Sequence, residues 1–353
     1  MLVECSHGGP QYRDLEAVRL TENDVLDFSV CCNPYGPPPG VRSALRAALP
    51  LSYPDSDCTL LRAALSRQVK VPADNLLVGS GSMELLRLAA LAYIRSGDLV
   101  VLPRPTFGEY ELACRMMGAM VYEQACDEDH AFRINAAVLA DTVRSLRPRA
   151  VFLCNPNNPT GWYLNKSEVL DVLSASEDTL LVLDEAYTGL IEGAWDTGDL
   201  LDKGNLVVMR SMTKDYGLAG LRLGYAMASS DIINNLRKVR PPWNVNSVAQ
   251  LAGTVALHSG DDHLEKCRTR MAGAKLKLQS ELEHLGLAPI HSHANFFLVK
   301  VGDALSFRAA LLRKGFLVRD CSSFGLPEYV RIGVRTPMQN KQLVQAIKEV
   351  LAR

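Results

Sequence analysis

Short apolar runs alternate with segments of helical spacing between about residues 70 and 228. The runs are apolar on both faces, which is typical of strands buried in a largely parallel sheet. Two of the segments between them, Met83–Ile94 and Lys166–Ser174, have the spacing of amphipathic helices. The alternation therefore predicts an α/β sheet covered by helices on both faces. The predicted strands are Leu76–Val78, Leu99–Leu102, Ala150–Cys154, Leu180–Asp184, Leu206–Arg210 and Leu223–Ala226.

Toward the C-terminus the alternation becomes irregular, which favours a second, smaller α+β domain. A helix closes the chain, because Leu343 and Ile347 lie on one apolar face. We expect an N-terminal segment, 1–35, that packs with the small domain, a large domain over 36–245 and the small domain over 246–353. The predicted strands of the last part are Phe296–Val301, Phe316–Val318 and Tyr329–Val334.

The composition argues against two classes of partner. With 353 residues and a formal net charge of −1, the chain has no basic field for nucleic acid or for an anionic membrane. It has no apolar run of about 18 residues, and charged residues interrupt its N-terminus, so we expect neither a membrane span nor a signal peptide. The nine cysteines are scattered without a C-x-x-C pair, which favours reduced thiols. These features predict a soluble, cytoplasmic protein.

Two charged residues stand directly after predicted strands, where ligands bind in such sheets. Asp184 ends a buried strand, and a carboxylate there needs a cation such as a protonated pyridine nitrogen. Lys214 follows another strand, and burial would lower its pKa and make the amine nucleophilic enough for a Schiff base. Tyr187 could donate to a phenolate oxygen of the same ring. The alternatives are a helix cap for Asp184 and a surface lysine for Lys214.

Two further segments after predicted strands suggest contacts to a phosphorylated ring. Gly79-Ser80-Gly81-Ser82 opens the helix at Met83, and amide groups and hydroxyls at a helix N-terminus bind anions. Ser211 and Arg222 could complete this phosphate site. The string Cys154-Asn-Pro-Asn-Asn158-Pro-Thr-Gly161 forms a turn that directs the Asn158 amide toward the sheet edge. Each segment alone could be an ordinary turn.

Together these residues resemble the PLP-dependent (pyridoxal 5'-phosphate) fold-type I superfamily of class I/II aminotransferases, over almost the whole chain. The resemblance implies that Lys214 carries PLP as a Schiff base, that Asp184 pairs with the pyridine nitrogen, and that Phe107 stacks on the ring. Asn158 and Tyr187 would hold the phenolate oxygen of the ring. The residues implied for the cofactor phosphate are Ser80, Gly81, Ser82, Ser211 and Arg222.

The same resemblance implies a homodimer and a site for an amino acid. Tyr53, in Ser52-Tyr-Pro-Asp, matches a tyrosine that reaches the cofactor phosphate of the partner subunit. Arg331, in Tyr329-Val-Arg-Ile, matches an arginine that binds the substrate carboxylate through two hydrogen bonds.

At a finer level the chain is similar to the histidinol-phosphate aminotransferase group and, within it, to the L-threonine-O-3-phosphate decarboxylases of cobalamin biosynthesis. His7, Arg319 and Arg335 lie in the matching stretches and are candidates to bind a phosphate on the substrate side chain; surface charges are the alternative. Asp215 departs from the pattern, which often has an aromatic residue there. The matching stretches are His7-Gly-Gly9, Asp27-Phe-Ser with Asn33-Pro-Tyr-Gly, Pro242-Trp-Asn-Val-Asn246 and Arg319 to Arg335.

These similarities favour decarboxylation of L-threonine O-3-phosphate, with transamination as the alternative. A non-catalytic PLP-binding regulator would need a basic DNA-binding segment, which the sequence lacks. A dinucleotide-dependent dehydrogenase would need a glycine fingerprint followed by an acidic ribose ligand, and that is also missing.

Overall fold

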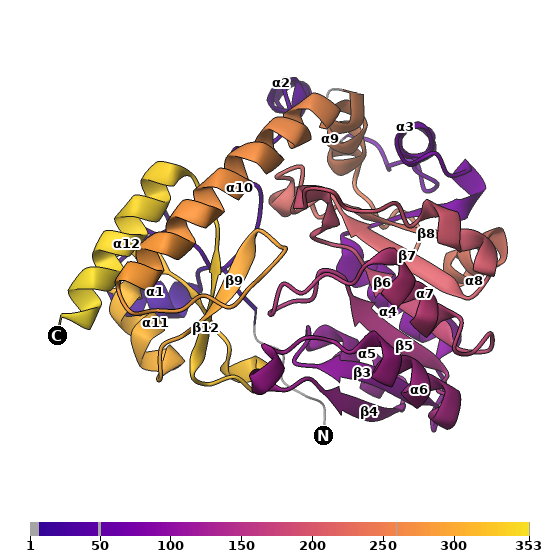
Figure 1. Cartoon of the computed structure of the whole chain (residues 1–353). Helices are drawn as coiled ribbons and strands as arrows, with labels where there is room; N and C mark the ends of the chain where they lie inside the picture. Colours follow the sequence, from indigo (N-terminus) through magenta and orange to yellow (C-terminus); the bar gives the residue numbers. More distant parts are fainter. Residues whose placement is uncertain (1–6, 49–50, 259, 353) are drawn as a thin grey trace.

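Seven strands form the central sheet of the computed structural model, which describes residues 7–48, 51–258 and 260–352 (Figure 1). The spatial order is β2-β8-β7-β6-β5-β3-β4, and β8 alone runs antiparallel to its neighbours. The predicted α/β class with a mostly parallel sheet is confirmed. The strands are β2 Leu76–Gly79, β3 Leu99–Arg104, β4 Met120–Ala125, β5 Ala150–Cys154, β6 Leu180–Asp184, β7 Leu206–Ser211 and β8 Gly224–Ala228.

The edge strand β4 is the one strand of this sheet that the apolar pattern did not predict. Most of its residues are exposed or half-buried, and it carries Glu123 and Gln124 in place of an apolar run. An edge strand is covered less completely than a central one, so its sequence need not be apolar on both faces.

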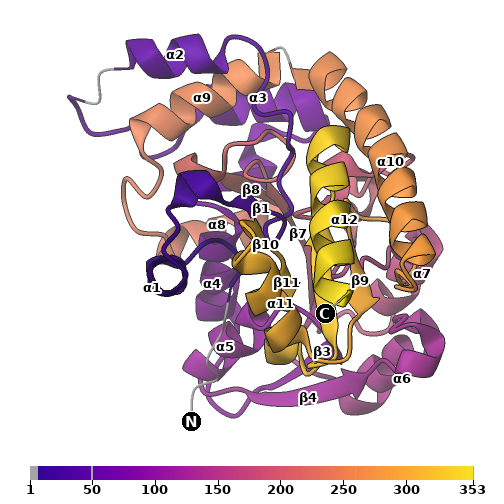
Figure 2. The ribbon, with the colours of Figure 1, turned by 90° about the vertical axis from the view of Figure 1, so that its left-hand side faces the viewer.

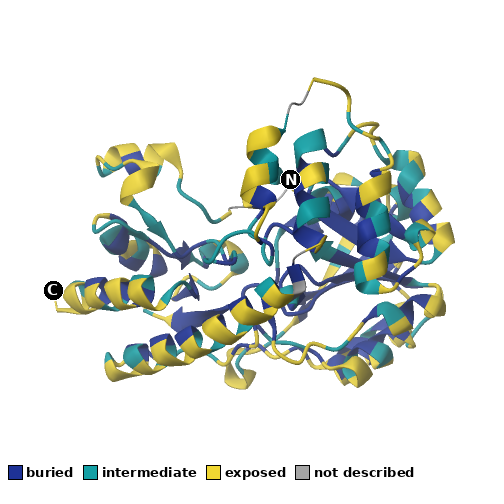
Figure 3. Ribbon diagram, turned by 90° about the horizontal axis from the view of Figure 1, so that it is seen from above, coloured by how far each residue is buried: buried dark blue, intermediate teal, exposed yellow. Residues whose placement is uncertain are grey.

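Helices cover both faces of the sheet, and each face has its own apolar cluster. One cluster packs α4, α5 and α8 against strand residues such as Phe152 and Val182. The other packs α3, α6, α7 and α9 against the alternate residues, such as Leu153 and Leu183. Figure 3 shows the buried strands between helices whose outer faces are exposed. These helices are α3 Thr59–Val69, α4 Ser82–Tyr93, α5 Glu109–Met116, α6 Ala136–Leu146, α7 Lys166–Leu173, α8 Ser230–Val239 and α9 Ser247–His258.

The small domain contains a three-stranded antiparallel sheet of order β11-β12-β9 and lies nearest the viewer in Figure 2. Its core joins Phe297 and Val330 of the sheet to Leu278 and Leu343 of two helices. The elements are α10 Gly260–His284, β9 Phe296–Lys300, α11 Ala304–Leu312, β10 Phe316–Leu317, β11 Arg319–Asp320, β12 Tyr329–Gly333 and α12 Pro337–Leu351.

The N-terminal part of the chain divides between the two domains. Strand β1, Leu26–Asp27, pairs in parallel with β10. Leu15 of α1, Tyr12–Ala17, packs against Leu312 and Leu317 of the small domain. Helix α2, Val41–Ala47, instead contacts α9.

The predicted domain boundary at residues 245 and 246 is wrong for one helix. Helix α9 packs against α2 and α3, and its Ala249 and Ala252 belong to the apolar core of the large domain. The long helix α10 continues from Leu264 in that core to Leu282 in the core of the small domain. The structure therefore divides the domains within α10, because the small residues of α9 fit closely against the neighbouring helices.

Other features of the described residues set limits on the chemistry. None of the described cysteines forms a disulfide. The described side chains include no group of three or more potential metal ligands of the His, Cys, Asp and Glu types. Within the described ranges, no helix is both long and apolar enough to cross a membrane.

Candidate active site

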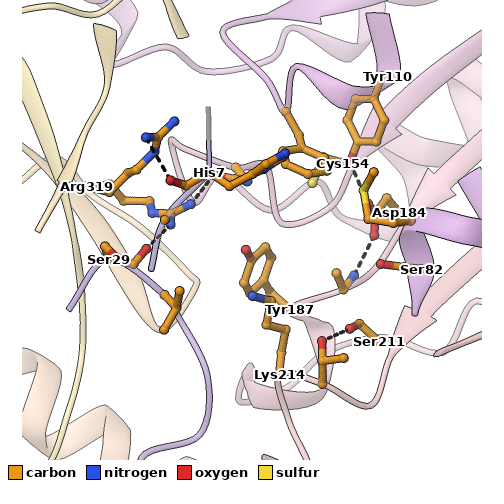
Figure 4. A pocket seen from close by; sticks show the side chains of 18 of the residues that line it. His7, Ser29, Ser82, Tyr110, Cys154, Asp184, Tyr187, Ser211, Lys214 and Arg319 are labelled. Atoms are coloured by element: carbon orange, nitrogen blue, oxygen red, sulfur yellow. Dashed lines mark hydrogen bonds between the residues drawn. The ribbon is translucent and has the colours of Figure 1, made fainter. Parts of the chain in front are cut away.

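A cavity of about 290 Å³ lies between the two domains, at the carboxyl ends of β5, β6 and β7 (Figure 4). This is where an open α/β sheet binds ligands. Most residues that the sequence singled out lie on its wall. The lining residues are His7, Gly8, Ser29, Val30, Ser82, Met83, Phe107, Tyr110, Cys154, Asn158, Asp184, Ala186, Tyr187, Ser211, Thr213, Lys214, Arg222, Arg319, Phe324 and Arg331.

Lys214 enters this cavity from the loop between β7 and β8. Its Nζ lies 5.7 Å from the centre of the Tyr187 ring, and its backbone oxygen accepts a 2.7 Å hydrogen bond from the Asn33 amide. Burial lowers the pKa of Lys214, but the acidic groups of Tyr187, Cys32 and Cys31 raise it, and the net direction is upward. The expected lowering of the Lys214 pKa is therefore wrong, because the three acidic groups together outweigh the effect of burial.

Asp184 is buried at the end of β6 and is held by two donors. The Tyr110 hydroxyl donates to Oδ2 at 2.7 Å, and the Ala186 amide donates to Oδ1 at 3.0 Å. Burial raises the pKa of Asp184, whereas the two hydrogen bonds lower it. The charge of Lys214 also lowers this pKa, but no ion pair to Asp184 is present among the described residues, and a cationic ring nitrogen would supply one.

The start of α4 and the loop before β8 together form an anion cradle. Gly81 caps α4 with a φ of +79°, and a Cβ there would lie 2.9 Å from a guanidinium nitrogen of Arg222. Ser82, Ser211 and Thr213 also line the cavity, and the Ser211 and Thr213 hydroxyls lie 2.5 Å apart. Ser80 takes another role, because its amide donates to the Glu84 carboxylate at 2.6 Å and it does not line the cavity.

Asn158 is placed by the rigid turn that follows β5. Asn155 exchanges two hydrogen bonds with Leu164, and the Asn157 side chain donates to the Pro105 oxygen at 2.9 Å. The Asn158 Oδ1 accepts a hydrogen bond from Arg331 of the small domain. The turn thus fixes an amide at the point where the two domains meet.

Phe107 and Tyr187 both contribute aromatic rings to the cavity wall. Phe107 packs edge-on against Tyr110 with ring centres 5.6 Å apart. Tyr187 packs edge-on against Phe296 with ring centres 4.9 Å apart. Both rings are therefore held in place by neighbours and can position a planar ligand.

The small domain supplies two arginines that are direct partners across its sheet. Arg319 of β11 pairs in register with Arg331 of β12, and both side chains are buried on the cavity wall. Arg331 donates to the Ser29 oxygen at 2.6 Å, and its Nε has no hydrogen-bond partner among the described residues. Burial and the charge of Arg331 lower the pKa of Arg319. Like charges opposite each other in a sheet are destabilising, so this pair favours anionic ligands.

His7 reaches the cavity from the N-terminal segment. Its Nε2 lies 2.8 Å from the buried Glu109 carboxylate, and its backbone oxygen accepts a hydrogen bond from Arg319 at 3.4 Å. A Cβ on Gly8 would overlap the Ser29 carbonyl oxygen, so only glycine lets the segment pass there.

Four predicted site residues do not line the cavity: Ser80 and Gly81 of the anion cradle, and Arg335 and Tyr53, which lie elsewhere. Arg335 donates to the Asp27 oxygen at 2.8 Å and to Gln339 at 3.1 Å, so its guanidinium is directed to the N-terminal segment. Tyr53 is 79% exposed, and its ring lies 4.6 Å from that of Trp243.

Sequence reasoning missed several residues that line or support this site, among them Thr213, Tyr110 and Glu109. Thr213 lies within the Ser211–Lys214 motif, where its hydroxyl could have been recognised. Tyr110 and Glu109 contact Asp184 and His7 across 74 and 102 residues of chain, and no local pattern indicates those contacts.

The residues that the structure brings together fit PLP. The Lys214 amine, the buried Asp184 carboxyl and an anion cradle of Ser82 and Arg222 line one cavity, with Gly81 directly behind Arg222. They provide a covalent attachment point, a partner for a ring nitrogen and a phosphate site, respectively.

Comparisons with known proteins agree with this arrangement. The profile of the family described as aminotransferase class I and II matches residues 16–347. The histidinol-phosphate aminotransferase of Moorella thermoacetica is 36% identical over 94% of this chain and 87% of its own. That of Symbiobacterium thermophilum is also 36% identical, over 95% and 91%.

Solved structures of related proteins have the same fold. The crystal structure of histidinol-phosphate aminotransferase from Sinorhizobium meliloti in complex with pyridoxal-5'-phosphate superimposes with a TM-score of 0.88, at 24% identity over 98% of this chain and 96% of that one. L-threonine-O-3-phosphate decarboxylase from Porphyromonas gingivalis gives a TM-score of 0.80 and 29% identity over 92% and 99%. From the family match, the relatives and the site together, the chain belongs to the class I and II aminotransferase family and is a PLP-dependent enzyme.

Proposed function

We propose that this enzyme is an aminotransferase that exchanges the amino group of a phosphorylated substrate of the histidinol-phosphate type with 2-oxoglutarate. This differs from the decarboxylation that the sequence favoured. The curated relatives described above are named histidinol-phosphate aminotransferases and are more similar in sequence than the decarboxylase structure.

The relatives favour transamination, and the register pair Arg319 and Arg331 is the observation that carries the choice of a substrate with two anionic groups or one dianion. Two adjacent buried guanidinium groups suit ligands with two anionic groups or with one dianion. Glutamate and 2-oxoglutarate each carry two carboxylates, and a phosphate ester is a dianion near neutral pH. The same two arginines can therefore serve both halves of a transamination.

Each residue of the cavity has a role that follows from its position. Bound PLP supplies an electron sink for the bonds of the substrate's Cα. Asp184 keeps the ring nitrogen protonated, and Asn158 and Tyr187 orient the ring through its phenolate oxygen. Lys214 would accept the proton from the substrate's Cα on Nζ and would deliver it to the cofactor carbon that bears the substrate's nitrogen. Arg331 and Arg319 orient the substrate through its anionic groups.

Decarboxylation of L-threonine O-3-phosphate is the second candidate. It is favoured by the 29% identity to the decarboxylase structure from Porphyromonas gingivalis over nearly the whole of both chains. This substrate carries a carboxylate and a phosphate, which also suits two arginines. The orientation of the carboxylate relative to the cofactor ring decides between loss of a proton and loss of CO₂.

The two candidates are separated by supplying each substrate to the purified holoenzyme. Histidinol phosphate with 2-oxoglutarate should yield glutamate, and L-threonine O-3-phosphate should yield no CO₂. Release of CO₂ from the threonine phosphate without consumption of a keto acid would overturn the aminotransferase proposal and support the decarboxylase.

We further propose that the enzyme is a homodimer in which Tyr53 completes the partner's cofactor site. Its 79% exposure and its stacking with Trp243 leave it available to a second subunit. Sedimentation should give the mass of a dimer, and mixing inactive Lys214→Ala with Tyr53→Ala protein should restore part of the activity. A monomer, or mixing without any gain, would count against this assembly.

A further inference from the structure

Asp215 directly follows the lysine that binds PLP, yet it does not line the cavity. Its carboxyl group packs against Gly189 instead. A Cβ on Gly189 would overlap Asp215 Oδ2 and would lie 2.9 Å from Asp215 Cβ. The contact is therefore possible only because residue 189 has no side chain.

Gly189 belongs to the short 3-10 turn Thr188–Leu190, which begins immediately after Tyr187. The same turn is held from another direction, because Arg268 of α10 donates to the Gly189 oxygen at 3.1 Å. Whatever fixes Gly189 thus also fixes the backbone that presents the Tyr187 ring to the cavity.

The Lys214 loop is held on its other side by the N-terminal segment. The Asn33 amide donates to the Lys214 oxygen at 2.7 Å, and its side chain donates to the Asp215 oxygen at 2.9 Å. Within the loop, Asp215 Oδ1 accepts the Tyr216 amide at 2.8 Å. The backbone of residues 214 and 215 is therefore fixed by Asn33, while the Asp215 side chain joins it to the turn after Tyr187.

The charges that face Asp215 come from three elements: Arg210 on β7, Tyr225 on β8 and Arg268 on α10. Arg210 is already paired with the Glu185 carboxylate at 2.8 Å, so it compensates Asp215 incompletely. Burial raises the pKa of Asp215 to about 7, against the lowering effect of the Tyr216 amide and the two arginines. The carboxyl is a costly group to retain at this position for packing alone.

We propose that Asp215 is a positioning residue whose carboxyl group, seated on Gly189, holds Lys214 and Tyr187 in a fixed relation for attachment of PLP. It acts through the backbone of both residues and does not touch the substrate. This role concerns the cofactor and does not depend on which amine is the substrate.

The first test follows PLP added to the apoenzyme, by the visible absorption of covalently bound PLP and by borohydride trapping with mass spectrometry. Asp215→Ala should slow attachment to Lys214 by about tenfold, since small misplacements of a reacting group cost this much or more. Asp215→Asn keeps the shape and the Tyr216 hydrogen bond and should restore the rate to within about twofold of wild type. Asp199→Asn, which removes an exposed carboxylate that pairs with Lys166, is the matched control.

The pH midpoint of the visible band gives a readout that a merely structural role would not move. Tyr187 raises the pKa of the Lys214 amine, so moving the two apart should shift this midpoint downward by about half a unit to one unit in Asp215→Ala, whereas Asp215→Asn should leave it near the wild-type value. An unchanged attachment rate together with an unchanged midpoint in Asp215→Ala would overturn the proposal.

The second test uses the glycine contact and remains informative if Asp215→Ala does not fold. Gly189→Ala should reproduce the slow attachment, whereas Gly220→Ala should not, because Gly220 lies in the loop between β7 and β8 and its added Cβ meets open space. In the double variant Gly189→Ala, Asp215→Ala the two effects should not add, because both remove one contact. A Gly189→Ala enzyme that attaches PLP as fast as Gly220→Ala would contradict the proposal.

Discussion

The two walls of the cavity are built in different ways. The large-domain wall consists of residues at strand ends or helix starts of one sheet, such as Lys214, Asp184 and Ser82, and their positions follow from the strand order. The small-domain wall joins His7 to Arg319 and Arg331, which come from opposite ends of the chain and depend on each other for their positions. In our proposal, the first wall holds the cofactor and the second holds the substrate.

The difference indicates that the substrate site can vary more easily than the cofactor site. A cofactor site made from one rigid sheet keeps its geometry whatever the substrate is. A substrate site assembled from short segments of the small domain can change its donors without disturbing the cofactor. Substitutions on the two walls should therefore affect different measured quantities.

The largest effect is expected from Lys214→Ala. The variant should fail to form the visible band of covalently bound PLP, and its kcat should fall by at least about 10³-fold, because the proton shuttle is lost. Absorption spectra and steady-state rates measure both. A variant that kept the band would place the attachment point elsewhere on the large-domain wall.

Arg319→Ala should raise KM for a phosphorylated substrate by about tenfold or more, since a hydrogen bond to a charged group is lost. KM for a dephosphorylated analogue should change much less. Arg335→Ala is the comparison, because its guanidinium is directed to the Asp27 oxygen, and we expect a smaller change in KM. Equal increases in KM for the two variants would show that Arg319 does not bind the substrate phosphate.

Gly81→Ala should weaken PLP binding by about tenfold through its contact with Arg222, measured by titrating PLP into the apoenzyme. Gly97→Ala is a matched control, because it also has a positive φ but no atom near the added Cβ. Both variants should lose about 1 kcal/mol of unfolding free energy, since left-handed backbone disfavours a side chain. Equal PLP affinities would remove Gly81 from the phosphate cradle.

The last effect concerns the pH dependence of stability and not the activity. The pKa of Asp215 is about 7 in the folded chain and near 3.8 when unfolded, so the folded state binds more protons between these values. The unfolding free energy of the apoenzyme should therefore fall, relative to Asp215→Asn, as pH rises from about 4 to 7, and the difference should stay constant above. Urea unfolding at several pH values measures it; a difference that does not change with pH would contradict the raised pKa.

Sequence and structure agree best where the chemistry follows local pattern. The strand runs placed Asp184, Ser211 and Lys214 at one sheet edge, since parallel strands end on the same side. The sequence did not predict the edge strand β4 or the packing of α9 with the large domain, because neither segment has a distinctive local pattern. Arg335 lies close in sequence to the arginines of the small-domain wall, yet its side chain is directed elsewhere. The assignment of catalytic and binding roles to individual residues stays a prediction.

By itself the sequence determined the α/β class, the PLP family and the residues at strand ends, because hydrophobic periodicity and short motifs are local properties of a chain. Only the tertiary structure decided that Tyr110 supports Asp184, that Glu109 holds His7 and that Arg319 lies opposite Arg331. These contacts depend on how two domains and a distant N-terminal segment pack. That packing is set by the combined burial of many apolar side chains, which no single stretch of sequence encodes.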